Sequence, residues 1–208
     1  MHIFVCGNHN QIDIKGSSII YPSTTMIMLP FIIKEGDIMK KIGLFWGSTS
    51  GNTEIAVEFI EEYLQGEGFE VDSYNIADDD IEKILEYDNL IIGCPTWNIG
   101  ELQDDWDSVF DDYEELDFSG KTAGFFGCGD QVGYPDNFLD AIGMLGKTFM
   151  EKGGKLVGRC SRDDYDFRDS ICLDGDDLLG LGLDYDNEEE KCEDQMTSWL
   201  DKITKEFE

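Results

Sequence analysis

Histidine is missing from most of this chain. Both histidines, His2 and His9, lie near the N-terminus, and residues 39–208 contain none. This absence excludes Ser-His-Asp and Cys-His catalysis from residues 39–208, and it also excludes a metal site built from imidazoles. The six cysteines form no Cys-x-x-Cys pair and show no clustered spacing, which is typical of reduced thiols in an intracellular protein.

Basic residues are also scarce. The chain has 15 Lys and Arg residues against 46 Asp and Glu residues, which gives a net charge of −31. Such a surface repels nucleic acid and anionic lipid, and it attracts basic partners at salt-sensitive rates. An acidic, salt-adapted proteome accounts equally well for this composition, and the two explanations are compatible. We therefore expect no nucleic-acid partner and no membrane insertion, and no loop matches a calcium-binding EF-hand.

Long uninterrupted apolar runs are absent. The stretch from Ile19 to Ile33 is broken by Pro22 and Pro30 and is too short to span a bilayer. No small-residue cleavage site follows it, and Met39 with the two lysines after it looks like a natural start. We predict that residues 1–38 are an N-terminal extension, either a disordered tail or a segment that is not part of the native chain. Residues 39–208 are expected to form one domain.

Strand-like and helix-like patterns alternate from Met39 onward. Helical spacing of apolar residues appears around 56–64, 138–149 and 196–207. This alternation predicts an α/β fold in which helices cover both sides of a parallel, doubly wound sheet. The apolar strand runs lie at 41–45, 70–76, 88–94, 121–128 and 155–160.

The fifth strand run is followed by an unusual segment. Residues 160–177 are polar and acidic, and a second apolar run follows at 178–183. This pattern indicates a loop inserted into the last strand, which resumes before a final helix begins near Asn187.

The segment Gly47-Ser48-Thr49-Ser50-Gly51-Asn52-Thr53 follows directly after the first strand run. Its glycines allow successive N–H groups to point into one concavity, and a bound anion would sit at the start of the next helix. A Walker loop would need a lysine where Asn52 stands. Clusters of this composition are more often plain turns, but uncharged donors of this kind suit one monophosphate that stays bound.

Two further loops, 94–101 and 128–136, follow the third and fourth strand runs. Ligands of open α/β sheets bind beyond the carboxyl ends of the strands, so the three loops converge if their strands are neighbours. Trp97 and Tyr134 could hold a planar ring between them, each with about 0.5–1.5 kcal/mol of stacking energy. Asp130, beside Gly129, could accept a hydrogen bond from a ring N–H. A monophosphate, a planar ring and a ring N–H together describe flavin mononucleotide (FMN).

Three motifs resemble the cofactor loops of flavodoxins. They are residues 48–53, the sequence Pro-Thr-Trp-Asn-Ile-Gly at 95–100, and the pattern Gly-Asp-Gln-x-Gly-Tyr-x-Asp-Asn-Phe at 129–138. Residues 164–167 and 182–187 resemble the long-chain subgroup, whose last strand carries an insertion. The resemblance covers about residues 40–207 and implies a flavodoxin-like three-layer αβα sandwich. The order of its five-stranded parallel sheet, 2-1-3-4-5, comes from the resemblance alone.

The resemblance also implies which residues bind the cofactor. Trp97 and Tyr134 would stack on opposite faces of the flavin, and residues 98–100 would lie against its N5 edge, where the peptide can reorient on reduction. Gly129 and Asp130 would meet the pyrimidine edge, and Asp186 would reach the ribityl chain. The phosphate would be held by Ser48, Thr49, Ser50, Gly51, Asn52 and Thr53. The remaining residues of the two outer loops that complete the expected site are Pro95, Thr96, Asn98, Ile99, Gly100, Cys128 and Gln131.

The function implied by the resemblance is that of a low-potential one-electron carrier rather than an enzyme. It would use non-covalently bound FMN and shuttle between the semiquinone and the hydroquinone. A strongly acidic domain raises the energy of the anionic hydroquinone, and each ~1.4 kcal/mol lowers a one-electron potential by about 59 mV. Gly100 would let the backbone offer a carbonyl to the semiquinone N5–H.

Partners and alternatives follow from the same residues. The acidic face formed by Glu101, Asp104, Asp105 and Asp107 would meet basic docking faces of redox proteins, for example a ferredoxin/flavodoxin-NADP reductase, oxidoreductases or photosystem I. We expect a cytoplasmic monomer, or a plastid protein if the source is an alga. Two alternatives stay open: an FMN-dependent NAD(P)H quinone reductase of related fold, and a non-redox anion-binding or interaction module.

Overall fold

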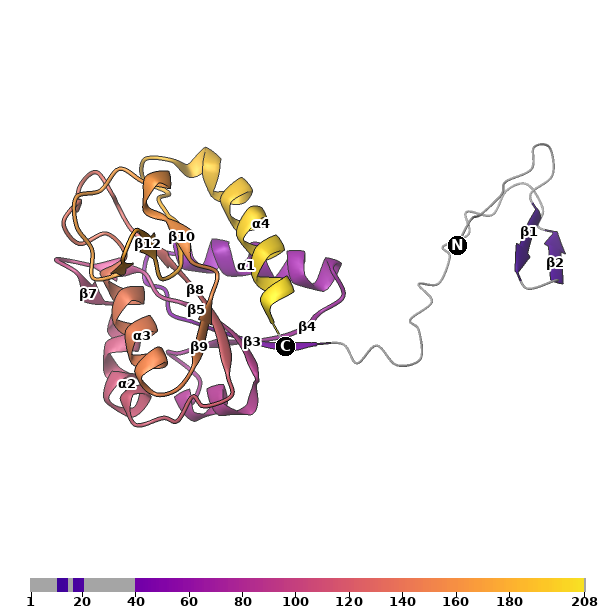
Figure 1. Cartoon of the computed structure of the whole chain (residues 1–208), viewed down its shortest axis with the longest axis horizontal. Coiled ribbons are helices and arrows are strands. Elements are labelled where there is room, and N and C mark those ends of the chain that lie inside the picture. The colour runs from indigo at the N-terminus through magenta and orange to yellow at the C-terminus, as the bar shows by residue number, and fades with distance from the viewer. Residues whose placement is uncertain (1–10, 15–16, 21–39, 208) are drawn as a thin grey trace. The chain divides into compact units, whose positions relative to one another are not determined.

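A computed structural model describes residues 11–14, 17–20 and 40–207 of the chain (Figure 1). The chain divides into two compact units, Met1–Ile38 and Met39–Glu208. In the first unit, β1 (Gln11–Ile14) pairs antiparallel with β2 (Ser17–Ile20). The rest of the predicted N-terminal extension lies outside the described residues, so its role stays a prediction.

The second unit is built on one parallel sheet. The strands run in the order β13-β8-β5-β3-β4, and β9 also pairs with β8. All of these pairings are parallel, and β9 and β13 are two pieces of the last strand on either side of the insertion. The predicted order 2-1-3-4-5 is therefore confirmed. The strands are β3 (Lys41–Trp46), β4 (Glu70–Asn75), β5 (Asn89–Gly93), β8 (Thr122–Cys128), β9 (Lys155–Val157) and β13 (Leu181–Leu183).

Helices cover both faces of this sheet (Figure 1). On one face, α1 (Asn52–Gly66) and α4 (Glu189–Glu206) bury their apolar sides in one core cluster. On the other face, α2 (Asp104–Glu114), α3 (Asp140–Glu151) and the 3₁₀ helix η1 (Ile81–Glu86) pack on a second cluster. The three-layer αβα sandwich is therefore confirmed, with α2 and η1 as helices that the sequence pattern did not mark.

The insertion is more ordered than the expected polar loop. It forms a small antiparallel sheet in the order β10-β12-β11, and Tyr165 and Phe167 are buried in the core. The Tyr165 hydroxyl accepts a hydrogen bond from Gly182 N at 3.0 Å and so ties the insertion to β13. Its elements are β10 (Cys160–Ser161), η2 (Arg162–Asp164), β11 (Leu173–Asp174) and β12 (Asp177–Leu178).

The register of the central strands sets the position of the loops. Gly93 at the end of β5 is aligned with Trp46 of β3 and with Phe126 of β8. The three central strands therefore end at the same edge of the sheet, and the loops after them leave from that edge. Among the described residues, no helix is long and apolar enough to cross a membrane.

Candidate functional site

The loop after β3 enters α1 through a left-handed glycine. Gly51, the N-cap of α1, has a φ of 96° and offers no side-chain cap to the helix. Its N–H donates to Ser48 Oγ at 3.2 Å, which curls the loop back on itself. The first N–H groups of a helix lack partners within the helix. This loop therefore presents uncharged donors at a helix N-terminus, which is the arrangement that favours an anion.

The base of the loop is packed against the start of α2. A Cβ added to Gly47 would lie 2.3 Å from Gln103 Oε1 and 2.8 Å from Trp106 Cδ1. Gly47 N donates to Gly93 O at 3.2 Å, and the buried Trp106 Nε1 donates to the same oxygen at 2.9 Å. Only a glycine fits at position 47 without moving these neighbours.

The basic residue nearest to the loop in the preceding strand faces other partners. Lys41 is the first residue of β3, so it lies at the opposite end of that strand from the loop. Its ammonium group is 2.7 Å from Asp72 Oδ2, and its pKa is raised chiefly by that hydrogen bond. Lys41 therefore supplies no charge to the loop.

The second loop is a tight hairpin. Its strands, β6 (Thr96–Trp97) and β7 (Glu101–Leu102), pair antiparallel and leave Asn98, Ile99 and Gly100 as the turn. Asn98 has a φ of 48° and Gly100 a φ of 83°, and Asn98 Nδ2 donates to Glu101 Oε2 at 2.6 Å. Ile99 is 77% exposed at the tip. Residues 96–102 are therefore a short hairpin with Trp97 in its first strand and Ile99 exposed at its tip.

The third loop is organised by Asp130. Its Oδ1 accepts hydrogen bonds from Gly133 N at 2.6 Å, Val132 N at 3.0 Å and Asn187 Nδ2 at 2.8 Å. These bonds lower the pKa of Asp130, the largest effect coming from the Gly133 N–H. We expected Asp130 to accept a hydrogen bond from a ring N–H of a ligand. In the structure, its Oδ1 already accepts hydrogen bonds from these three protein groups. Tyr134 follows in the same loop and is 52% exposed.

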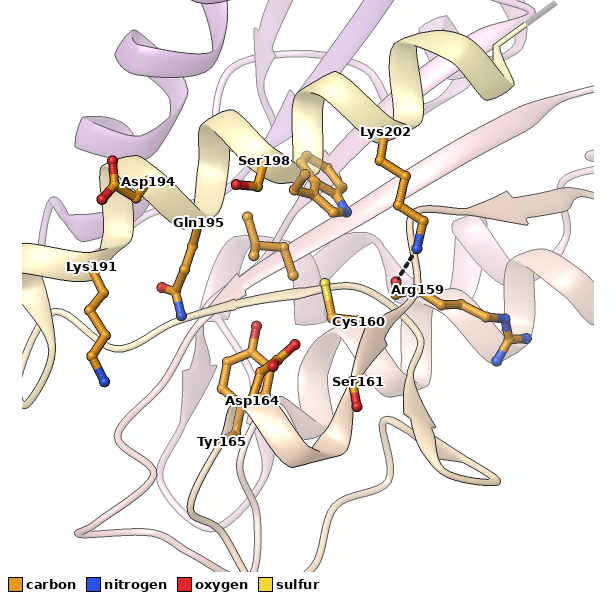
Figure 2. A pocket seen from close by; sticks show the side chains of 12 residues that line it. Arg159, Cys160, Ser161, Asp164, Tyr165, Lys191, Asp194, Gln195, Ser198 and Lys202 are labelled. Carbon is orange, nitrogen blue, oxygen red and sulfur yellow. Dashed lines mark hydrogen bonds between the residues drawn. The ribbon is translucent and has the colours of Figure 1, made fainter.

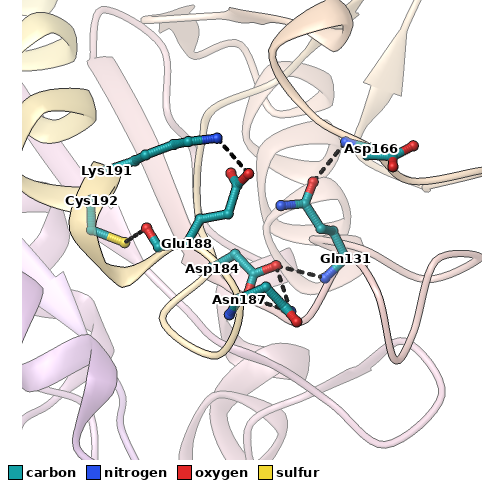
Figure 3. A network of polar contacts seen from close by, with 7 residues as sticks. All are labelled: Gln131, Asp166, Asp184, Asn187, Glu188, Lys191 and Cys192. Atoms are coloured by element: carbon teal, nitrogen blue, oxygen red, sulfur yellow. Dashed lines mark hydrogen bonds and ion pairs between the residues drawn. The ribbon is translucent and has the colours of Figure 1, made fainter.

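A polar network supports the third loop from the end of β13 (Figure 3). Asp184 is 2% exposed, and its Oδ2 accepts a hydrogen bond from Gln131 N at 3.1 Å. Asn187 Nδ2 donates to both oxygens of Asp184 at 3.0 Å. The buried Gln131 accepts a hydrogen bond from Asp166 N of the insertion at 2.7 Å, so its side chain faces the insertion. Sequence reasoning did not identify Asp184 or Asn187 as supports.

Two of the expected site side chains face the core beneath the loops. Thr53 is 1% exposed and its hydroxyl donates to Cys128 Sγ at 3.7 Å. Burial raises the pKa of the Cys128 thiol to about 12, and the charge of Asp186 adds to the rise. The Thr53 hydroxyl is thus engaged by the core beneath the loop. Asp186 itself is exposed, which leaves its carboxylate free to face solvent or a ligand.

The hydroxyl of Tyr185 is an orphan. Among the described residues it is a buried side-chain oxygen with no hydrogen-bond partner. Burial raises its pKa, and the thiols of Cys128 and Cys192 are among the groups near it. A buried polar group without a hydrogen bond costs about 1–3 kcal/mol of stability, so a ligand that bonded to the Tyr185 hydroxyl would recover this free energy.

Among the remaining residues of the expected site, Thr96 binds the first turn of α3. Its Oγ1 accepts a hydrogen bond from Ala141 N at 3.2 Å, and Pro95 is buried beside it. The structure therefore brings the three predicted loops to one edge. It leaves the aromatic side chains of Trp97 and Tyr134 at least partly accessible there.

A separate hollow of about 570 Å³ lies between the insertion and α4 (Figure 2). None of its lining residues belongs to the three loops. Its basic side chains already have partners: Arg159 pairs with Asp174 at 2.8 Å, and Lys202 Nζ donates to Arg159 O at 2.6 Å. Lys191 is 2.5 Å from Glu188. This hollow is therefore distinct from the loop site.

Comparisons with known proteins agree on one family. The flavodoxin family model matches residues 44–199. A flavodoxin of Nostoc sp. is 44% identical over 168 residues, which cover 81% of this chain and 98% of the relative. Flavodoxin 2 of Escherichia coli strain K12 is 38% identical over 168 residues, covering 80% of this chain and 96% of the relative.

Solved structures give the same answer. A flavodoxin of Fusobacterium nucleatum bound to flavin mononucleotide has a TM-score of 0.78 and 30% identity, covering 82% of this chain and 100% of that one. A mutant of it, also bound to flavin mononucleotide, has a TM-score of 0.79 and 31% identity, covering 83% of this chain and 100% of that one. The quinone-reductase alternative is not favoured by these matches. With three loops at one sheet edge, an insertion in the last strand and this similarity over most of its length, the chain belongs to the flavodoxin family.

Proposed function

We propose that this flavodoxin binds FMN without a covalent bond and carries electrons one at a time between redox proteins. The observation that supports this most directly is the meeting of three loops at one sheet edge. One loop is an uncharged anion cradle, and each of the other two carries an accessible aromatic residue, Trp97 or Tyr134. FMN consists of a monophosphate and a planar ring that accepts and releases single electrons.

The donor set fits a phosphate monoester. The left-handed Gly51 opens the start of α1, whose N-cap carries no side-chain cap of its own. The phosphate would be held by the backbone N–H groups of this loop and by the hydroxyls of Ser48, Thr49 and Ser50. Asp186 would reach the ribityl chain from beside the third loop. The orphan hydroxyl of Tyr185 shows that this end of β13 has hydrogen-bonding capacity left over.

The ring would lie between the two outer loops. Trp97 would cover one face and Tyr134 the other, and the turn at 98–100 would lie at the ring edge. Gly129 and Asp130 would border the opposite edge, where Asp130 Oδ1 is already engaged by Gly133 and Asn187. These residues would exclude water from the ring and hold it within a domain of strong negative charge, which disfavours added negative charge and lowers the potential.

The partners that this surface fits are basic. Three aspartates, Asp104, Asp105 and Asp107, occupy the first turn of α2, directly after the second loop. Because these negative charges lie close in sequence to the loop that carries Trp97, they would attract the basic docking faces of partners toward the flavin ring. Redox enzymes with such faces, including reductases of the ferredoxin/flavodoxin-NADP type and photosystem I, are the partners we propose for a monomeric chain.

The experiment is a ligand titration of the cofactor-free protein. FMN fluorescence should be quenched at 1:1 stoichiometry with submicromolar affinity, and riboflavin, which lacks the phosphate, should bind at least tenfold more weakly (about 1.4 kcal/mol). Electron transfer to a basic acceptor such as cytochrome c should slow as salt is added. Failure to bind FMN at micromolar concentrations would refute the proposal. Rapid NADPH oxidation without an added reductase would favour an enzyme instead.

A further inference from the structure

A buried carboxylate lies directly beside the turn of the second loop. Asp140 is the first residue of α3, and it is 1% exposed. A Cβ added to Gly100 would lie 2.4 Å from Asp140 Oδ2, so the Gly100 backbone and this oxygen are in close contact. The turn therefore rests on the side chain of Asp140.

The same carboxylate also contacts two other segments. Asn137 Nδ2, in the residue directly after the third loop, donates to Asp140 Oδ2 at 2.9 Å. Ile171 N, in the insertion, donates to Asp140 Oδ1 at 2.6 Å. Both oxygens accept hydrogen bonds at the N-terminal end of a helix, where a negative charge is favoured. One buried group thus joins the second loop, the end of the third loop at Asn137, and the insertion.

The backbone around Asp140 is held in place at some cost. Leu139, fully buried just before it, has a φ of 64°, a left-handed conformation that is strained for a residue other than glycine. On the other side of Asp140, Ala141 N donates a hydrogen bond to Thr96 Oγ1 of the second loop at 3.2 Å. From the insertion, Ser170 Oγ donates to Phe138 O and accepts from Cys172 N at 2.9 Å. The first turn of α3 is therefore clamped between the second loop and the insertion.

We propose that Asp140 is a positioning residue of the flavin site. It fixes the turn at 98–100, places a buried negative charge against that turn, and connects the position of the insertion to it. The inference rests on the proposed function, because the turn meets a cofactor only if FMN binds between the loops. The insertion is then a brace for the redox site rather than a surface feature alone.

Removal of the charge tests the electrostatic half of this proposal. Asp140→Asn keeps the shape of the side chain, and the Asn137 amide can rotate to offer its oxygen to the new amide group. The lower of the two one-electron midpoint potentials of bound FMN should rise by about 59 mV, which is a tenfold change in that equilibrium. Asp176→Asn is the matched control: it removes one charge from an exposed residue of the insertion, outside the segment that contacts Asp140, and should shift neither potential measurably.

Removal of the contacts tests the positioning half. Asp140→Ala should shift both potentials and weaken FMN binding about tenfold, since the turn loses its support. Hydrogen exchange at the Ile171 amide should accelerate in Asp140→Ala and stay slow in Asp140→Asn, which retains an acceptor. Asp140→Glu, which keeps the charge but not the fit, should restore the lower potential more than the affinity.

A double-mutant cycle tests the connection to the insertion. Ser170→Ala removes the hydroxyl that binds Phe138 and Cys172, and its effect on the lower potential should be non-additive with that of Asp140→Ala. Additive effects would overturn the connection, and unchanged potentials in both Asp140→Asn and Asp140→Ala would overturn the role of Asp140. Both results require wild-type protein that binds FMN, so they are distinct from a failure of the proposed function.

Discussion

Gln103 Nε2 donates a hydrogen bond to Thr49 Oγ1 at 3.2 Å, which joins the N-cap of α2 to the middle of the loop 47–53. Gln103 is 2% exposed, and its Oε1 also accepts a hydrogen bond from Trp106 N at 3.4 Å. Gln103 therefore caps α2 and also holds the loop that precedes α1. Its two roles make the loop geometry depend on α2.

Gln103→Ala should lower the free energy of unfolding by about 1–2 kcal/mol, because an N-cap and a buried hydrogen bond are lost. FMN affinity should fall about fivefold, since Thr49 loses its tether. Chemical denaturation and fluorescence titration measure the two effects. In a cycle with Thr49→Val, the losses of affinity should be less than additive; strict additivity would show that the contact does not matter for binding.

Gly47 and Gly51 should respond differently to alanine. At Gly47 the added Cβ would meet Gln103 Oε1 at 2.3 Å, whereas at Gly51 it would have nothing within 4 Å. Gly47→Ala should therefore displace the loop and abolish tight FMN binding. Gly51→Ala should cost about 1–2 kcal/mol of stability through its positive φ alone, and Gly51→Asn should cost less. Equal losses of FMN affinity in the two alanine variants would contradict the steric explanation.

The aromatic residues should contribute to ring binding rather than to folding. Trp97→Ala and Tyr134→Ala should each weaken FMN binding by about 1–3 kcal/mol, which combines lost stacking with lost apolar burial. Trp97→Phe should recover most of the loss. Stability of the cofactor-free protein should change by less than about 1 kcal/mol in the Tyr134 variant, because that side chain is 52% exposed. Unaltered affinity in both alanine variants would place the ring elsewhere.

The acid sensitivity of the third loop should depend on Asp130. Its pKa is lowered from 3.8, chiefly by the Gly133 N–H and also by Asn187, so the folded state favours the carboxylate. The stabilisation is present above pH 3.8 and is lost as the pH falls through the lower folded-state pKa. Between pH 5 and pH 3, thermal stability should decline less steeply in Asp130→Asn, which cannot titrate. Identical pH profiles for the two proteins would exclude this contribution.

The buried thiols should be unreactive in the native protein. Burial raises the pKa of Cys94, and it raises the pKa of Cys128 and Cys172 to about 12. In a Cys6→Ser background at pH 8, Ellman's reagent should label these three thiols only after unfolding. Quantification by mass spectrometry checks each site, and rapid native labelling of Cys128 would show that the core beneath the loop 47–53 opens.

The architecture could be predicted because its signals are local. Buried parallel strands appear as short apolar runs, helices as 3.6-residue periods, and the loop glycines as breaks between them. The insertion was detectable as an acidic interruption of the last strand, but Tyr165 and Phe167 were not identified as core residues. Their burial depends on Phe138, just before α3, and on β13, which lie beside the insertion only in the folded chain.

The amino-acid sequence by itself determined the α/β class and marked three loops, with the uncharged segment 47–53 in the first and the aromatic residues Trp97 and Tyr134 in the other two, while the strand order came from family resemblance. The tertiary structure alone decided which residues support these loops. Gln103 binds Thr49, 54 residues away in the sequence, and Asp184 binds Gln131, 53 residues away. Asp140 lies against Gly100 and binds Ile171. The reason is physical. Periodicity and turn propensity act between near neighbours in the chain, whereas a buried polar group takes whichever partners the packed layers bring within hydrogen-bonding distance.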